Sequence, residues 1–161
     1  MFPAKVHNLF RSSRIAASGL KSSRSWMNMI SNNISNMHTL DNGRPTRDGN
    51  YVPYARQVPL FAKVLSEKFR ENRVNGDVIN GVRVKGVVEL EGDYKKVYDP
   101  AHPAARKPGT ADAGYVYYPN ISVSQEMADL RIASAAYEAN LSVIAVSAKM
   151  NQQALSIAKS A

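Results

Sequence analysis

The sequence predicts an α+β fold in which long N- and C-terminal helices pair as an antiparallel coiled-coil-like unit, with a small β-rich domain inserted between them. Seven of the eight prolines and eight of the nine glycines lie in residues 41–119, so the two ends are nearly free of helix breakers. Both ends carry apolar residues at helical spacing, and the middle contains a segment that alternates with period two. We therefore expect a helical domain split between residues 1–40 and 120–161, and a β-rich domain at 41–119.

Residues 1–40 contain a seam with steps of three and four residues, the spacing that keeps one stripe of a helix facing a partner helix. Pro3 suits the first turn of this helix, and Asp41-Asn42-Gly43 is a turn signal that ends it. The seam consists of Val6, Leu9, Ser13, Ala16, Leu20, Ser23, Met27, Ile30, Ile34 and Met37.

Residues 120–161 contain a second seam of the same kind, and no charged residue lies on it. Pro119 precedes it, and Ser122-Val123-Ser124-Gln125 is typical of a capping box at a helix start. An ordinary surface helix also has an apolar stripe, so plain amphipathic helices remain the alternative to a coiled-coil seam. The second seam consists of Val123, Met127, Leu130, Ser134, Tyr137, Leu141, Ile144, Ala148, Asn151, Leu155 and Ala158.

Both seams are thin, because several positions hold Ser, Ala or Asn. Each missing large side chain forgoes about 1.5–3 kcal/mol of burial. Twelve of the 25 residues between positions 12 and 36 are Ser or Asn, which are poor helix formers. Such helices are marginal alone, so the sequence favours helices that order on assembly.

The middle of the chain contains the predicted strands. From Val82 to Leu90, apolar and polar residues alternate, as in a half-buried strand. Gly92-Asp93 then predicts a hairpin into a strand at 94–98. Residues 58–65 and 115–118 are further strand candidates, and 44–53 and 100–114 are predicted loops.

The composition excludes several kinds of chemistry. With no cysteine, the chain cannot form disulfides, thiolate zinc sites or a cysteine nucleophile. His7, His38 and His102 lie too far apart in sequence for a metal-ligand motif, and no hydrolase, metalloprotease or nucleotide-binding motif is present. We therefore expect no catalytic residues, no cofactor and no metal. No apolar run reaches the length of a signal peptide or a membrane span, so we expect neither.

The formal net charge of +8 leaves a nucleic-acid-binding module as the alternative function. Of this charge, +5 lies in residues 1–40, which hold no acidic residue, whereas residues 120–161 are neutral. The five basic residues of the first helix are spread over several turns rather than gathered in one patch, and no stacking aromatics accompany a basic strand. This distribution favours a surface that is solvated or faces an assembly, and we expect no nucleic-acid partner.

Several motifs resemble those of bacterial flagellar rod and hook proteins. The N-terminal half carries Ala17-Ser18-Gly19-Leu20, Ser31-Asn32-Asn33-Ile34-Ser35-Asn36 and Pro53-Tyr54-Ala55-Arg56-Gln57. The later motifs resemble one proximal rod subunit in particular, and they are Val97-Tyr98-Asp99-Pro100, Gly114-Tyr115-Val116-Tyr117-Tyr118-Pro119-Asn120, Glu126-Met127-Ala128-Asp129-Leu130 and Ala133-Ser134-Ala135-Ala136-Tyr137-Glu138-Ala139-Asn140. The resemblance covers the chain from about residue 15 to its end. Ser35, Met37-His38, Trp26 and the 106–113 loop depart from the family pattern.

The resemblance implies a structural subunit of the flagellar basal-body rod. Such a subunit is exported unfolded through the flagellar type III apparatus, without signal cleavage, and polymerises helically in the periplasm. The hollow rod transmits motor torque and conducts exported subunits; the paired terminal helices form its inner tube and the middle forms an outer domain. The implied partners are copies of the chain, other rod proteins, the membrane ring, the export-gate base and the surrounding periplasmic rings.

The resemblance and the seams together define candidate assembly residues. We expect the apolar members to hold the helix pair, and the asparagines to fix its register by hydrogen bonds. Capping of a helix end is the alternative for Asn36. The candidates are Val6, Leu9, Leu20, Met27, Ile30, Asn32, Asn33, Ile34, Asn36, Met127, Leu130, Tyr137, Asn140, Leu141, Ile144 and Leu155.

Overall fold

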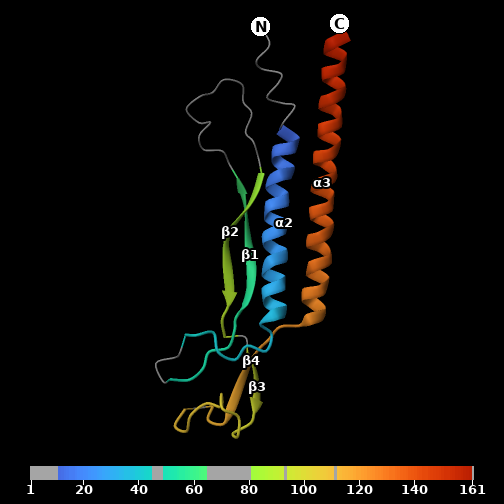
Figure 1. Ribbon diagram of the computed structural model, residues 1–161. Coiled ribbons are helices and arrows are strands. Elements are labelled where there is room, and N and C mark those ends of the chain that lie inside the picture. Colours follow the sequence, from blue (N-terminus) through green and yellow to red (C-terminus); the bar gives the residue numbers. More distant parts are fainter. Residues whose placement is uncertain (1–10, 45–48, 65–80, 93, 111, 161) are drawn as a thin grey trace, which may run out of the picture. The chain divides into compact units, whose positions relative to one another are not determined.

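The computed structural model describes residues 11–44, 49–64, 81–92, 94–110 and 112–160, with side chains up to residue 157. Its elements are α2 (Arg11–Ser35), β1 (Arg56–Val64), β2 (Gly81–Leu90), β3 (Tyr94–Tyr98), β4 (Tyr115–Pro119) and α3 (Val123–Ser160) (Figure 1). Helices near both ends and two small sheets between them confirm the α+β class.

The chain forms two compact units, each built from separate stretches of sequence. Unit 1 combines Met1–Met27, Pro59–Gly86 and Arg131–Ala161, and unit 2 combines Asn28–Val58 and Val87–Leu130. Both helices and both strands of the β1–β2 sheet contribute residues to each unit.

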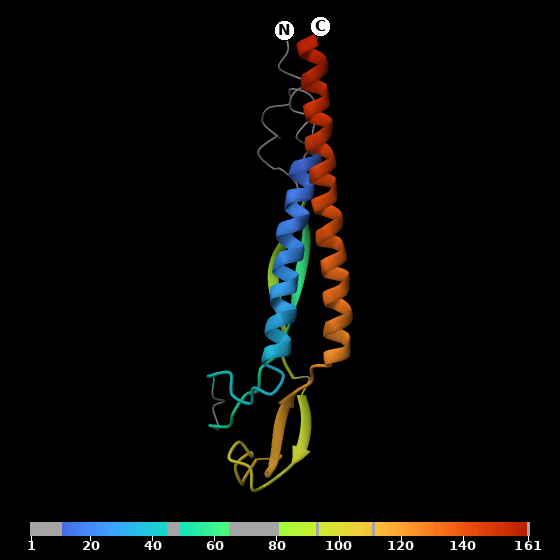
Figure 2. The same ribbon diagram turned by 45° about the vertical axis from the view of Figure 1, so that its right-hand side comes forward.

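In unit 1, α2 and α3 lie side by side and run in opposite directions, as Figures 1 and 2 both show. Their contact is made by small side chains. The hydroxyls of Ser12 and Ser147 are 2.9 Å apart, and the hydroxyl of Ser134 donates to the sulfur of Met27 at 3.7 Å. Ala133 of α3 is completely buried. Small residues let the helix backbones approach closely, and α3, with 38 residues, extends for roughly 57 Å at 1.5 Å per residue.

Gly19 of α2 lies against Asn140 of α3. A Cβ atom there would lie 2.7–2.8 Å from the side-chain amide of Asn140, which donates to the carbonyl oxygen of Ala136. Real Cβ contacts of this length essentially never occur, so any side chain at position 19 would force the Asn140 side chain to shift.

We expect Gly19→Val to weaken the pairing of α2 and α3 in unit 1. Overpacking of a close contact typically costs about 1–3 kcal/mol, and here the bulk would push Asn140 from its place. The measurement is helix content by circular dichroism together with swimming of cells that carry the variant. Gly86→Val is the control, because nothing lies within 4 Å of a Cβ at Gly86. Asn140→Ala should partly rescue Gly19→Val, and equal behaviour of the two glycine variants would contradict the packing argument.

The other side of α2 contacts β2 through serine hydroxyls in unit 1. The backbone N–H of Val82 donates to the hydroxyl of Ser18 at 3.1 Å, and its carbonyl oxygen accepts from the hydroxyl of Ser22 at 3.2 Å. The rings of Trp26 and Phe61 meet edge to face, 5.7 Å between centroids. Hydroxyls that complete the backbone hydrogen bonding of a strand explain why Ser is tolerated in this helix.

In unit 2, β3 and β4 form a separate antiparallel sheet with the register Tyr94↔Pro119 to Tyr98↔Tyr115. The expected hairpin between the 82–90 strand and β3 is therefore wrong, because β2 pairs with β1 and β3 with β4. Gly92 has a positive φ of 86°, so the chain does turn there. The ring contacts of Tyr98 with Tyr115 and of Tyr94 with Tyr117 favour the long-range partner.

The other expected elements are found with shifted ends. The 58–65 strand is β1, whose residues begin two positions earlier, and the 115–118 strand is β4. The first helix ends at Ser35, five residues before its expected end at residue 40. The backbone N–H of Asn36 makes a last helical bond to the carbonyl oxygen of Asn32, which also accepts from the Asn36 side-chain amide, and the backbone N–H of Thr39 then donates to the backbone oxygen of Asn36 in a tighter turn. The expected helix start around Pro3 lies outside the described residues.

Candidate assembly site

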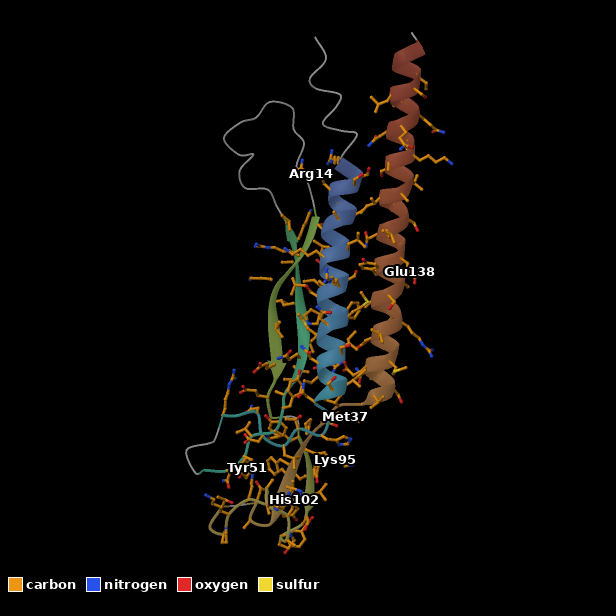
Figure 3. All side chains as sticks on the ribbon, in the orientation of Figure 1. Arg14, Met37, Tyr51, Lys95, His102 and Glu138 are labelled. Carbon is orange, nitrogen blue, oxygen red and sulfur yellow. The ribbon has the colours of Figure 1, made fainter. Side chains whose placement is uncertain are left out.

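A row of large apolar side chains on α3 is exposed. Ile132, Val143, Val146 and Met150 are 58%, 44%, 58% and 62% exposed. They are spaced by eleven, three and four residues, which brings them to one face of a helix with 3.6 residues per turn. We name these four residues the α3 outer stripe. Figure 3 shows side chains extending from α3 on the side away from α2.

The face of α3 that contacts α2 includes small and polar residues. Ala133 and Ser147 are buried there, and Asn140 lies between them at the contact with Gly19. The chain itself leaves the four large apolar side chains of the α3 outer stripe exposed. Exposed apolar stripes of this length are typical of surfaces that another protein covers.

The structure describes all but two of the candidate assembly residues; Val6 and Leu9 lie outside the described residues. Ile30 is buried, whereas Met127, Leu141 and Leu155 are 45%, 51% and 67% exposed. The half-buried members are Leu20, Met27, Ile34, Leu130, Tyr137 and Ile144. Met27 is brought to Ser134, as described above. A role of these residues in holding the helix pair remains a prediction.

The four candidate asparagines have different surroundings. Asn32 is exposed and offers its backbone oxygen to Asn36, whose side-chain oxygen accepts from the hydroxyl of Thr39 at 3.1 Å. Asn140 lies against Gly19 and donates to its own helix backbone. Asn33 is buried and takes part in a network that joins three elements. Whether Asn32, Asn33, Asn36 and Asn140 fix the register of the helix pair remains a prediction.

Asn33, in the last turns of α2, is the centre of a buried polar cluster in unit 2. Its amide nitrogen donates to the backbone oxygen of Gln57 at 2.9 Å and to Oε2 of Glu126 at 3.0 Å. Its amide oxygen accepts from the backbone N–H of Gln57 at 2.9 Å and from the Tyr54 hydroxyl at 3.1 Å. All four hydrogen-bonding positions of the amide are therefore used, as a buried polar side chain requires.

Glu126, in the first turn of α3, is the charged member of the same polar cluster and is completely buried. Nε of Arg56 donates to its Oε1 at 2.6 Å, and Nη2 of Arg56 donates to Asp129 at 3.1 Å. The polar cluster thus links the end of α2, the start of β1 and the start of α3. Arg56 and Glu126 both lie in motifs that resemble those of flagellar rod proteins. Their pairing could not be predicted, because no local pattern connects residues 70 positions apart.

The Tyr54 hydroxyl in the polar cluster has a raised pKa. Burial raises it above the ordinary value of 10.0, and the negative charges of Glu89 and Glu126 add to the rise. Both effects disfavour the phenolate in the folded state.

We expect this raised pKa to make the folded state sensitive to high pH. The stability linked to Tyr54 is fully present below the unfolded pKa of about 10 and is lost as the pH rises through the higher folded pKa. Urea unfolding between pH 8 and pH 11 measures it, and Tyr54→Phe should lose less stability over this range than the unaltered chain. Tyr98→Phe is the control because Tyr98 is mostly exposed. Equal slopes for Tyr54→Phe and the unaltered chain would contradict the assignment.

Within the described ranges, no three His, Asp or Glu side chains gather as metal ligands would. No helix among the described residues has the length and hydropathy needed to cross a membrane.

Comparison with known proteins defines the class. Residues 112–157, which include β4 and most of α3, match the family model described as the C-terminal region of the flagellar basal body rod FlgEFG proteins. This segment carries the whole α3 outer stripe and Glu126 of the polar cluster. The chain is thus a protein of the flagellar basal-body rod class, as the sequence motifs predicted.

Relatives over nearly the whole length define the family. The chain is 38% identical to the flagellar basal-body rod protein FlgC of Borreliella burgdorferi, over 92% of this chain and 97% of that protein. It is 32% identical to FlgC of Bacillus subtilis over 93% and 98% of the two chains, and 35% identical to FlgC of Agrobacterium fabrum over 84% and 85%. The chain belongs to the FlgC family of flagellar basal-body rod proteins, and the prediction of this particular proximal rod subunit is confirmed.

Proposed function

We propose that this chain is a structural subunit of the proximal flagellar rod, polymerises helically with its own copies and other rod proteins, and has no catalytic role. The rod it builds is hollow, transmits motor torque and conducts exported subunits. Membership of the FlgC family supports the rod assignment. The single observation that supports polymerisation is the α3 outer stripe, whose four large apolar side chains are between 44% and 62% exposed.

The free energy of burial explains why the α3 outer stripe favours assembly. Fully burying one Val, Ile or Met side chain contributes about 1.5–3 kcal/mol. Covering the α3 outer stripe with a neighbouring subunit therefore stabilises the contact by several such increments. The α3 outer stripe need not pair with the same stripe of another subunit. Contacts between two different surfaces that do not close into a ring generate a helical assembly.

The proposal divides the chain into three functional parts. Residues 1–40 and 120–161 supply the helices of the inner tube, which pair as an antiparallel coiled-coil-like unit, and residues 41–119 supply the outer domain. Antiparallel contact of α2 and α3 through Ser12, Ser147 and Gly19 supports the pairing. The candidate assembly residues act at these helix contacts.

The location and further partners follow from the rod role. The subunit is exported by the flagellar type III apparatus without signal cleavage and assembles in the periplasmic space. Besides other rod proteins, its partners are the membrane ring, the export-gate base and the surrounding periplasmic rings. The small seam residues support export, because helices that are marginal alone are easily held unfolded for passage through a channel.

Gene deletion and complementation test the proposed function. A deletion strain should lack rods beyond the basal rings and should not swim, and the intact gene supplied in trans should restore both. Electron microscopy of purified basal bodies and swimming in soft agar are the two readouts. A deletion strain that builds complete rods and swims would overturn the proposal.

A further inference from the structure

Strand β3 in unit 2 has one free edge. Asp99, directly after β3, donates its backbone N–H to the carbonyl oxygen of Gly114. The backbone groups of Asp99 that make this bond therefore face the side of β4. Backbone groups alternate between the two sides of a strand. The alternation turns the N–H and C=O groups of Tyr94, Lys96 and Tyr98 away from β4. Pro119, which has no N–H, lies opposite Tyr94. Proline is tolerated there because the strands exchange no backbone hydrogen bonds at this pair.

The corresponding edge of β4 is covered by the chain itself. The backbone N–H of Arg106 donates to the carbonyl oxygen of Tyr115 at 3.0 Å, and Gly114 donates to the carbonyl oxygen of Arg106 at 3.1 Å. Among the described residues no backbone hydrogen bond of this kind is made on the outer side of β3. The protein therefore protects one edge of the small sheet and leaves the other available for an additional strand.

Side chains hold the free edge in place. Asp112 accepts from the Tyr117 hydroxyl at 2.6 Å and from Nζ of Lys96 at 3.1 Å. The guanidinium group of Arg106 lies 3.9 Å above the Tyr117 ring. These contacts fasten the 99–114 loop to both strands, so an added strand would meet an ordered edge rather than a fraying one.

The charges of β3 decide between possible partners. Lys95 is exposed, whereas the ammonium group of Lys96 is held by Asp112, so pairing two β3 edges would bring two Lys95 ammonium groups near each other. Like charges directly opposite on neighbouring strands are destabilising, whereas opposite charges stabilise. The edge therefore disfavours a symmetric contact with another β3 and favours an extended segment that carries carboxylates.

The carboxyl end of β2 has that chemistry. Glu89 and Glu91 alternate with Val88 and Leu90, and the two apolar side chains are 43% and 40% exposed. Glu89 is paired with Arg44 within the chain, so Glu91 is the carboxylate that a second copy would meet. Val97 on β3 is exposed as well. Among the described residues, β1 is the one strand that pairs with β2, so the other side of β2 has no strand partner there.

We propose that the β3 edge of one subunit binds the carboxyl end of β2 from a second copy of this chain, as an added strand. The inference rests on the proposed rod function and names one contact within that assembly. The two surfaces differ, so the contact is heterologous and continues from copy to copy. Backbone hydrogen bonds between the two strands provide the affinity. An ion pair between Lys95 of one subunit and Glu91 of the other provides the specificity.

Crosslinking in assembled rods tests this contact, and the absence of native cysteine gives a clean background. Val97→Cys and Leu90→Cys are introduced together and separately, and basal bodies are treated with a short bis-maleimide reagent. The double variant should give a ladder of trimers and larger products of this chain. Co-expression of the two single variants should give dimers, and either single variant alone should give none. Ala101→Cys, an exposed loop position, replaces Val97→Cys as the matched control and should give no ladder with Leu90→Cys.

The outcomes separate this inference from the proposed function. Dimers from Val97→Cys alone, a product with a different protein, or no product in rods from motile cells would each overturn the inference and leave the rod function standing. Failure of the unaltered gene to restore swimming would overturn the rod function and the inference with it. A second measurement uses charge: Lys95→Glu should reduce swimming, and addition of Glu91→Lys should restore it. Unchanged swimming in Lys95→Glu, or no restoration, would count against the contact.

Discussion

Val146→Asp combined with Met150→Asp is expected to abolish rod assembly and swimming. The two side chains are 58% and 62% exposed in the free subunit, so their replacement removes little internal packing. In an assembled rod the same positions would be covered, and each would lose about 1.5–3 kcal/mol of burial. A carboxylate without a partner in that contact would cost further free energy through desolvation.

Basal bodies from cells that carry this double variant should end before the rod, and the purified subunit should retain the helix content of the unaltered chain. Gln152→Asp is the matched control, because it adds a carboxylate to an exposed polar position elsewhere on α3. Normal swimming of the Val146→Asp, Met150→Asp cells would show that the α3 outer stripe does not contact a neighbour. Equal loss in Gln152→Asp would show that any new charge on α3 is harmful and would remove the specific role of the α3 outer stripe.

Arg56→Ala is expected to destabilise the free subunit by about 3–5 kcal/mol, because it leaves the buried Glu126 carboxylate without its cationic partner. The 2.6 Å contact between Nε of Arg56 and Oε1 of Glu126 is lost, and so is the bond to Asp129. Asn33 still donates to Glu126, but a neutral amide does not compensate the charge. Urea unfolding followed by far-ultraviolet circular dichroism measures the change in the free energy of unfolding.

Arg44→Ala is the matched control for the Arg56→Ala experiment. It also removes an arginine that pairs with a glutamate, Glu89, but the two side chains are 72% and 37% exposed and the atoms are 3.5 Å apart. Exposed pairs contribute about 0–1 kcal/mol, so the control should lose little stability. Equal losses for Arg56→Ala and Arg44→Ala would contradict the view that the buried polar cluster holds unit 2 together.

The parts of the fold that the sequence predicted are those fixed by local patterns. Alternation from Val82 onward predicted β2, and Pro119 followed by Ser122 predicted the start of α3. The pairing of β3 was not local, because its partner begins at Tyr115, beyond a loop whose closure depends on Asp112 and Tyr117. The end of α2 at Ser35 lies before the turn signal at 41–43, which therefore did not give the boundary.

The candidate site was predictable in kind but not in detail. The seam spacing favoured large side chains such as Tyr137 and Leu141, whereas the helix contact also involves Gly19, Ala133 and Ser147, whose small size hides them from a hydrophobicity pattern. The polar cluster was also hidden, because it joins Asn33, Arg56 and Glu126 across large separations in sequence. Their motifs were recognised by resemblance, and only the structure brings them within hydrogen-bond distance.

A density map of the basal body, at a resolution that shows side chains and from cells in which this gene is the only source of the subunit, tests the central claim most directly. We predict that the chain occupies the proximal rod. We also predict that helices of neighbouring subunits cover the α3 outer stripe, which consists of Ile132, Val143, Val146 and Met150. A map in which these four side chains face solvent, or in which the chain is absent from the rod, would contradict it.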